Sequence, residues 1–177
     1  MNARTWIERL ALTPHPEGGF YAETYRASFE VSPVGEGLTS AVTSIHYLLE
    51  AGDFSGFHRI AYPELWYFHD ASPGTSLALH EIDAAGHHRV RYLGAGLGAD
   101  SKDVLSLAVE PGVWFAAEVV AGAAGRASRS EPEKPYVLVS CAVAPGFRFE
   151  IFEMARREAM LREFPQHAEV LQRLCRE

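Results

Sequence analysis

The stretch GDFSGFHRIAYPELWYFHDA, residues 52–71, decides the fold class. It predicts two short strands, rich in aromatic residues, on either side of a turn that contains Pro63. We expect the two strands to be neighbours, because so short a turn joins them. Successive side chains of a strand point to opposite faces, so alternation collects one set of residues on a common face: His58, Ile60, Glu64, Trp66 and Phe68.

Similar short segments continue on both sides of this stretch. Gly, Pro or Asp separates most of them, and residues 83–86 have the composition of a hairpin turn. Many short strands without helices between them predict an all-β sandwich or barrel. The expected strands are 20–26, 40–49, 56–60, 65–69, 77–82, 88–93, 104–110, 113–120 and 136–143.

Helices are expected only at the two ends of the chain. Residues 4–12 carry apolar side chains at helical spacing and predict a short helix that covers one end of the barrel. Residues 152–164 and 165–175 predict two helices, separated at Pro165, that pack outside the barrel. Residues 121–135 are small and polar, which predicts a surface loop.

Size and charge restrict the function classes. A chain of 177 residues predicts a single domain, 1–177, and it has no apolar run of the roughly 20 residues that a membrane helix needs. The N-terminus lacks the apolar core of a secretory signal, so we expect a soluble, cytoplasmic protein. The net charge of -7 argues against nucleic acid and anionic membranes as partners. Cys141 and Cys175 are interpreted as free thiols.

The face with His58 and Glu64 is the candidate site. If it lines the interior, the sequence describes an aromatic bowl that holds one base and one acid, as small-molecule sites do. The alternative is a buried His58–Glu64 pair with a structural role only, because buried charges generally come in pairs.

Two motifs resemble those of the cupin superfamily. Gly52, His58 and Glu64 match the first Gly, the first His and the Glu of the first cupin motif, whereas Ile60 and Ala71 replace its second His and closing Gly. Residues 111–115, PGVWF, resemble the second motif shortened by one residue. Phe115 then stands where that motif has its last metal-binding His.

A narrower resemblance covers most of the chain. It is to the cupin-5 family, an uncharacterised cupin subfamily that was formerly a domain of unknown function. The resemblance implies a double-stranded β-helix (jelly-roll) barrel and a homodimer, related in fold to deoxysugar-nucleotide 3,5-epimerases and to sugar-binding seed-storage proteins. It implies no settled activity. The segments that carry it are PHPEGGFYAETYR (14–26), SGFHRIAYPELWYFHDASP (55–73), EPGVWFAAE (110–118) and SCAVAPGFRFEIFEMARREAMLREFPQH (140–167).

Two enzymatic interpretations stay open. In the first, His58 and Glu64 bind a divalent metal, Mn, Fe, Ni or Zn, with His46 or His69 recruited to complete the ligand set. In the second, which follows the epimerases, no metal takes part and His58 removes a proton next to a carbonyl while Glu64 orients it. Tyr25 or Tyr67 would return the proton, and Arg26 or Arg59 would stabilise the enolate oxygen.

The third interpretation is non-catalytic and is the one favoured. The barrel binds a small carbohydrate-like or sugar-nucleotide ligand, because aromatic walls suit the faces of sugar rings. The expected pocket and ligand-binding residues are Arg26, His46, His58, Glu64, Trp66, Phe68 and Trp114.

Overall fold

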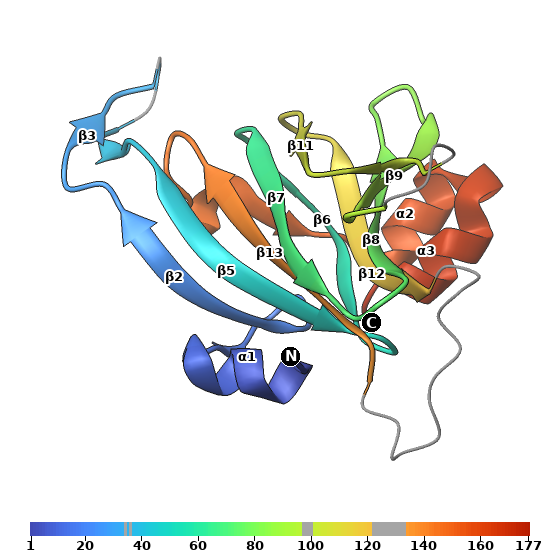
Figure 1. Ribbon diagram of the computed structural model, residues 1–177. Coiled ribbons are helices and arrows are strands. Elements are labelled where there is room, and N and C mark those ends of the chain that lie inside the picture. Colours follow the sequence, from blue (N-terminus) through green and yellow to red (C-terminus); the bar gives the residue numbers. More distant parts are fainter. Residues whose placement is uncertain (34, 36, 97–100, 122–133) are drawn as a thin grey trace.

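The computed structural model describes residues 1–33, 35, 37–96, 101–121 and 134–177, and the fold is mostly β (Figure 1). The described strands are β1 (Thr13–Pro14), β2 (Phe20–Arg26), β3 (Glu30–Val31), β4 (Thr39–Ser40), β5 (Thr43–Glu50), β6 (Phe54–Ile60), β7 (Glu64–Ala71), β8 (Thr75–Ile82), β9 (His88–Leu93), β10 (Asp103–Val104), β11 (Ser106–Val109), β12 (Trp114–Ala121), β13 (Tyr136–Val143) and β14 (Phe152–Met154). The described helices are α1 (Ala3–Arg9), α2 (Arg157–Glu163) and α3 (Ala168–Leu174), with 3-10 turns η1 (Phe149–Ile151) and η2 (Pro165–His167).

The long strands form two six-stranded sheets. The first has the order β1-β2-β5-β13-β7-β11 and the second has the order β10-β9-β8-β12-β6-β14. Hydrogen bonds between described strands do not close the two sheets onto each other, since each sheet ends in its own edge strands. Strands β3 and β4 make a separate two-stranded ribbon that extends beyond β2 and β5 (Figure 1).

The turn around Pro63 takes the chain from one sheet to the other. The expectation that β6 and β7 are neighbours is therefore wrong, because β6 pairs with β12 and β14 whereas β7 pairs with β11 and β13. The predicted alternation is nevertheless correct. Ile60 and Trp66 are both buried in the core between the sheets.

The helices cover the outer faces of the sheets. Helix α1, whose first turn is capped by Asn2, packs on Leu48 and Leu138 of the first sheet instead of covering a barrel end. Helices α2 and α3 pack on the second sheet through residues such as Phe57, as expected for the C-terminal segment. Figure 1 shows the helices on opposite sides of the molecule, α1 beneath β2 and β5 and α2 and α3 beside β8 and β12.

The C-terminal segment differs from the expectation at its start. Residues 152–154 form β14, which pairs with β6, so the first C-terminal helix begins only at Arg157. The separation of the two helices at Pro165 is confirmed. Most of the expected loop 121–135 lies outside the described residues. Within the described part of the chain, no helix has the length and apolar character needed to span a membrane.

Candidate functional site

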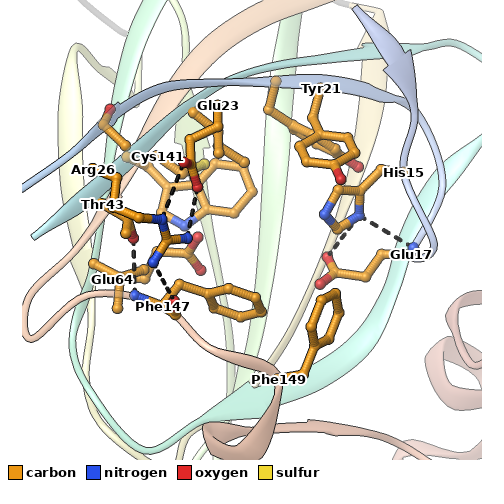
Figure 2. A pocket seen from close by; sticks show the side chains of 15 residues that line it. His15, Glu17, Tyr21, Glu23, Arg26, Thr43, Glu64, Cys141, Phe147 and Phe149 are labelled. Atoms are coloured by element: carbon orange, nitrogen blue, oxygen red, sulfur yellow. Dashed lines mark hydrogen bonds and ion pairs between the residues drawn. The ribbon is translucent and has the colours of Figure 1, made fainter. Parts of the chain in front are cut away.

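A cavity of about 150 Å³ opens on the inner side of the first sheet (Figure 2). Its walls are largely aromatic and aliphatic, and its polar groups include three carboxyl side chains, one imidazole and one guanidinium. Small-molecule sites typically combine such walls with a few polar groups. The lining residues are His15, Glu17, Tyr21, Glu23, Arg26, Thr43, Ser44, Ile45, Tyr47, Glu64, Trp66, Cys141, Val143, Phe147 and Phe149.

Glu17 is held in the cavity wall by a tight turn. Gly18 and Gly19 adopt positive φ angles of 114° and 70°, which side chains with a Cβ rarely adopt. A Cβ on Gly18 would also lie 2.1 Å from the Phe54 carbonyl oxygen. The Glu17 carbonyl oxygen accepts hydrogen bonds from the Gly56 amide and from Arg176 Nε. The backbone at Glu17 is thus fixed from strand β6 and from the C-terminus.

The Glu17 carboxylate connects three polar side chains. Its Oε2 accepts a hydrogen bond of 3.0 Å from Ser55 Oγ and lies 3.4 Å from His58 Nε2. His15 Nδ1 lies 3.9 Å from the same oxygen and accepts a 3.2 Å hydrogen bond from the Glu17 amide. The sequence-based partner for His58 was Glu64, but the structure pairs His58 with Glu17.

His58 lies behind the cavity wall, with 3% of the residue exposed. Its Nδ1 is 2.7 Å from the Gly56 carbonyl oxygen. Its ring packs against Phe115, at 4.0 Å between ring centroids, and against Phe152 at 5.4 Å. Phe115, the residue that replaces a metal-binding His of the second cupin motif, therefore covers the imidazole with an apolar ring.

Glu64 supplies the second carboxyl group of the cavity. Although the residue is partly exposed, protein encloses its carboxyl, and this burial raises its pKa to about 8, with a further contribution from the charge of Glu17. The nearby polar groups of Trp66 and Cys141 act in the opposite direction and lower the pKa of Glu64. Trp66 is 3% exposed, and its indole N–H makes no well-directed hydrogen bond within the described residues. Glu64 is thus mostly protonated at neutral pH and lies close to a buried donor that lacks a good partner.

The mouth of the cavity carries a charged pair, Glu23 and Arg26 (Figure 2). The Arg26 guanidinium donates two hydrogen bonds, of 3.1 and 2.7 Å, to the Glu23 carboxylate. A bulge between Glu23 and Tyr25 shifts the strand alternation, so that Arg26 faces the cavity. Tyr25, expected as a catalytic acid, is 52% exposed and lies outside the cavity lining.

Three other expected pocket residues do not line this cavity. His46 contacts Ser140 at 3.1 Å and the His69 ring at 5.7 Å, on the face of the sheet opposite to Tyr47. Trp114 lies on the outer face of the second sheet, in the cluster beneath α2 and α3. Phe68 packs at the border of the core between the sheets. Glu64, Trp66 and Arg26 are the expected residues that line the cavity, Arg26 at its mouth.

The donor set does not fit a first-row metal ion. Among the described residues, no group of three or more His, Cys, Asp or Glu side chains is arranged to hold one. His58 Nδ1 is occupied by the Gly56 carbonyl oxygen, and Phe115 and Ile60 take the places of two further His ligands. We therefore do not assign His58 or Glu64 as metal ligands.

Residues of the cavity lining that were not predicted as site residues include His15, Glu17 and Tyr47. A signal was present, because Glu17 directly precedes two glycines in a segment of the family resemblance. A glycine pair fixes a sharp turn and can aim the preceding side chain inward. Nothing in a single sequence shows that this turn closes against β6.

One family model matches most of the chain. The cupin-5 family model, described as "Cupin superfamily (DUF985)", matches residues 4–155. No curated protein matches the chain. A solved structure of a protein from Shewanella oneidensis is 34% identical, with a TM-score of 0.81, over 99% of this chain and 98% of that one. A hypothetical protein from Leishmania major is 30% identical, with a TM-score of 0.83, over 100% of both chains.

A more distant structure shows the fold alone. A cupin 2 domain-containing protein from Halorhodospira halophila is 14% identical, with a TM-score of 0.51, over 93% of this chain and 88% of that one. Such a low identity indicates a shared architecture and carries no information about the ligand.

Proposed function

We propose that this chain, which belongs to the cupin-5 family of the cupin superfamily, binds a small, uncharged, hydroxyl-rich molecule of the carbohydrate kind in its interior cavity. We also propose that its two sheets are the halves of the jelly-roll barrel of that superfamily. The observation that carries the ligand proposal is the grouping of Trp66, Glu17 and Glu64 in one cavity with aromatic walls.

The polar groups suit hydroxyl groups. A sugar hydroxyl both donates and accepts hydrogen bonds, so it can accept from the Trp66 indole N–H and donate to the Glu17 carboxylate. A buried donor without a good partner costs about 1–3 kcal/mol of stability. A ligand hydroxyl that accepts a hydrogen bond from the Trp66 indole N–H would remove this cost. Glu64, when protonated, can both donate and accept.

The charge of the cavity argues against a phosphorylated ligand. Among the described residues that line the cavity, Arg26 is the only Lys or Arg, and it is already paired with Glu23. A nucleotide diphosphate would therefore bring negative charge toward Glu17 without a free cation to meet it. Of the two expected ligand classes, the neutral sugar is favoured over the sugar nucleotide.

Titration calorimetry with neutral aldoses and ketoses of three to six carbons, and with UDP-glucose, tests the proposal. We expect saturable binding of at least one neutral sugar and weaker or no binding of UDP-glucose. Trp66→Phe should weaken sugar binding by about tenfold, because it removes a hydrogen-bond donor. Glu64→Gln should retain sugar binding, because the Gln amide donates and accepts hydrogen bonds as the protonated Glu64 carboxyl does. Glu8→Gln, in the exposed Arg4–Glu8 pair, is the matched control. Absence of binding by every neutral sugar would overturn the proposal.

The expected homodimer, the absence of nucleic-acid and membrane partners, and the cytoplasmic location stay predictions. Sedimentation equilibrium of the purified chain tests the dimer, since the mass of a monomer is 19.5 kDa.

A further inference from the structure

The position of one proton in the site follows from hydrogen-bond chemistry. A carbonyl oxygen can only accept, so His58 Nδ1 donates its N–H to the Gly56 carbonyl oxygen. In a neutral His58 ring, Nε2 would then present a lone pair to Glu17 Oε2, 3.4 Å away. Two lone pairs repel at this distance in a buried site. The Glu17–His58 pair must therefore hold one further proton.

The neighbours of Glu17 do not supply that proton. His15 Nδ1 accepts from the Glu17 amide, so it has no proton to donate to the carboxylate. Ser55 donates its hydroxyl hydrogen but stays neutral. An ion pair between a His58 imidazolium and the Glu17 carboxylate accommodates this proton at the 3.4 Å contact. Burial keeps this pair in place, because separating the charges would leave each without compensation.

A second proton lies on Glu64, another carboxyl group of the cavity. Glu64 is mostly protonated at neutral pH, and the charge of Glu17 contributes to this state. Figure 2 shows Glu17 with His15 on one side of the cavity and Glu64 near Arg26 on the other. A bound molecule thus meets a carboxylate on one side and a carboxylic acid on the other. Two titratable groups held in different protonation states are the usual arrangement for acid–base chemistry.

We propose that the cavity is a proton-transfer site in which Glu17 is the base and Glu64 is the acid, acting on a carbonyl compound with a hydroxyl group on the neighbouring carbon. The proposal rests on the proposed binding of carbohydrate-like molecules, since open-chain sugars have this grouping. It takes up the metal-free interpretation of the sequence but assigns the roles differently. His58 becomes a positioning residue, and Tyr25 has no part.

The proposed step is balanced without a co-reactant. Glu17 takes a proton from the hydroxyl-bearing carbon, and the electron pair of that C–H bond forms a carbon–carbon double bond. The carbonyl π electrons move to oxygen, which takes the proton of Glu64, and an enediol results. Return of a proton from Glu17 to either carbon, and of a hydroxyl proton to Glu64, regenerates the starting sugar or gives its isomer. His58 keeps its own proton throughout and holds Glu17 in place.

Hydrogen exchange in D₂O tests this step. The substrates are dihydroxyacetone, D-ribulose and D-fructose, and proton NMR follows the reaction. We expect the folded protein to exchange the hydrogen on the carbon next to the carbonyl for deuterium. General acid–base catalysis predicts exchange about 10²-fold or more above the protein-free rate. Glu17→Gln and Glu64→Gln should each remove most of this acceleration. Glu8→Gln should keep it, since Glu8 is an exposed residue of α1.

A parallel binding titration with the same three sugars separates the two proposals. Binding without exchange overturns the proton-transfer role and leaves the binding function intact. Absence of both overturns both. If both Gln variants exchange hydrogen as fast as the wild type, other groups catalyse the exchange and the proposal is overturned. Because Glu17→Gln disturbs a buried pair, Glu64→Gln provides an independent test. His58→Gln should shift the pH profile of exchange, which loss of packing alone would not do.

Discussion

His58 Nε2 lies 3.4 Å from Glu17 Oε2, and this contact joins strand β6 to the turn that precedes β2. His58 belongs to the stretch that predicts the fold, whereas Glu17 lies 41 positions earlier in a turn closed by two glycines. The wall of the cavity is therefore assembled from segments far apart in sequence.

We predict that Glu17→Gln destabilises the protein by about 1–3 kcal/mol, the cost of a buried polar group that loses its partner. His58 should at the same time lose its extra proton, because the carboxylate that holds it is gone. Urea unfolding and the ¹⁵N shifts of the His58 ring measure the two effects. A His58 ring with the same ¹⁵N shifts in both proteins would contradict the pairing. Glu8→Gln should change stability by less than about 0.5 kcal/mol.

We predict that ionisation of Glu64 lowers the stability of the folded protein as the pH rises. Its pKa is about 8 in the folded protein, against an ordinary value of 4.5, so between these values the folded state binds more protons than the unfolded state. The contribution of Glu64 is present in full below pH 4.5 and is lost as the pH rises through 8. Glu64→Gln should remove this loss. The free energy of unfolding of the variant should therefore increase relative to that of the wild type from pH 5 to pH 9. Urea unfolding at pH 5, 7 and 9 measures the difference, and parallel curves would contradict it.

A histidine cluster away from the cavity should give the stability of the protein the opposite pH dependence. His80 Nδ1 lies 3.2 Å from His88 Nε2, and His80 Nε2 lies 3.0 Å from Glu118 Oε1. The His88 ring lies 5.3 Å from the His167 ring, and Arg173 pairs with Glu118. Burial lowers the pKa values of His80 and His88 from 6.5.

The unfolded chain therefore takes up protons at these two histidines at higher pH than the folded chain. Their contribution to stability is present above pH 6.5 and is lost as the pH falls below that value. A His80→Gln, His88→Gln double variant should lose stability less steeply than the wild type between pH 6.5 and 5, measured by thermal unfolding. His87→Gln is the control, because the side chain of His87 is 81% exposed. An equal slope in wild type and double variant would contradict the prediction.

The turn at Glu17 offers a matched pair of glycine variants. Gly18 and Gly52 both have positive φ, but a Cβ would collide with the Phe54 carbonyl oxygen only at Gly18, whereas Gly52 has open space around it. Gly52→Ala measures the cost of the backbone conformation, about 1 kcal/mol. Gly18→Ala should cost clearly more, because backbone must also move. Chemical unfolding compares them, and equal losses would show that the turn does not pack closely on β6.

The alternation of side chains along the strands predicts much of the fold from the sequence. The bounds of β2, β9 and β13 match the expected strands, and the inward positions of Ile60 and Trp66 follow from the same pattern. Local periodicity reports which side chains share a face of one strand. It does not report which strands pair, so it wrongly predicts that β6 and β7 are neighbours, although they belong to different sheets.

The site was less predictable because it depends on long-range contacts. The bulge between Glu23 and Tyr25 exchanges the faces of Tyr25 and Arg26, and no residue of the strand marks it as a glycine would. Glu17 enters the site only because its turn closes against β6. His46 shares a strand with Tyr47 but faces away from the cavity, since neighbouring side chains point to opposite faces.

The indole N–H of Trp66 gives the most direct test of ligand binding in the cavity. The chain contains three Trp residues, and Trp6 already donates to Asp70 while Trp114 lies on the outer face under the helices. On titration with the tightest-binding neutral sugar, the Trp66 indole proton should shift saturably in the proton–nitrogen NMR spectrum while the other two stay fixed. Trp66→Phe assigns the signal. A Trp66 signal that does not move while the sugar binds would contradict the account.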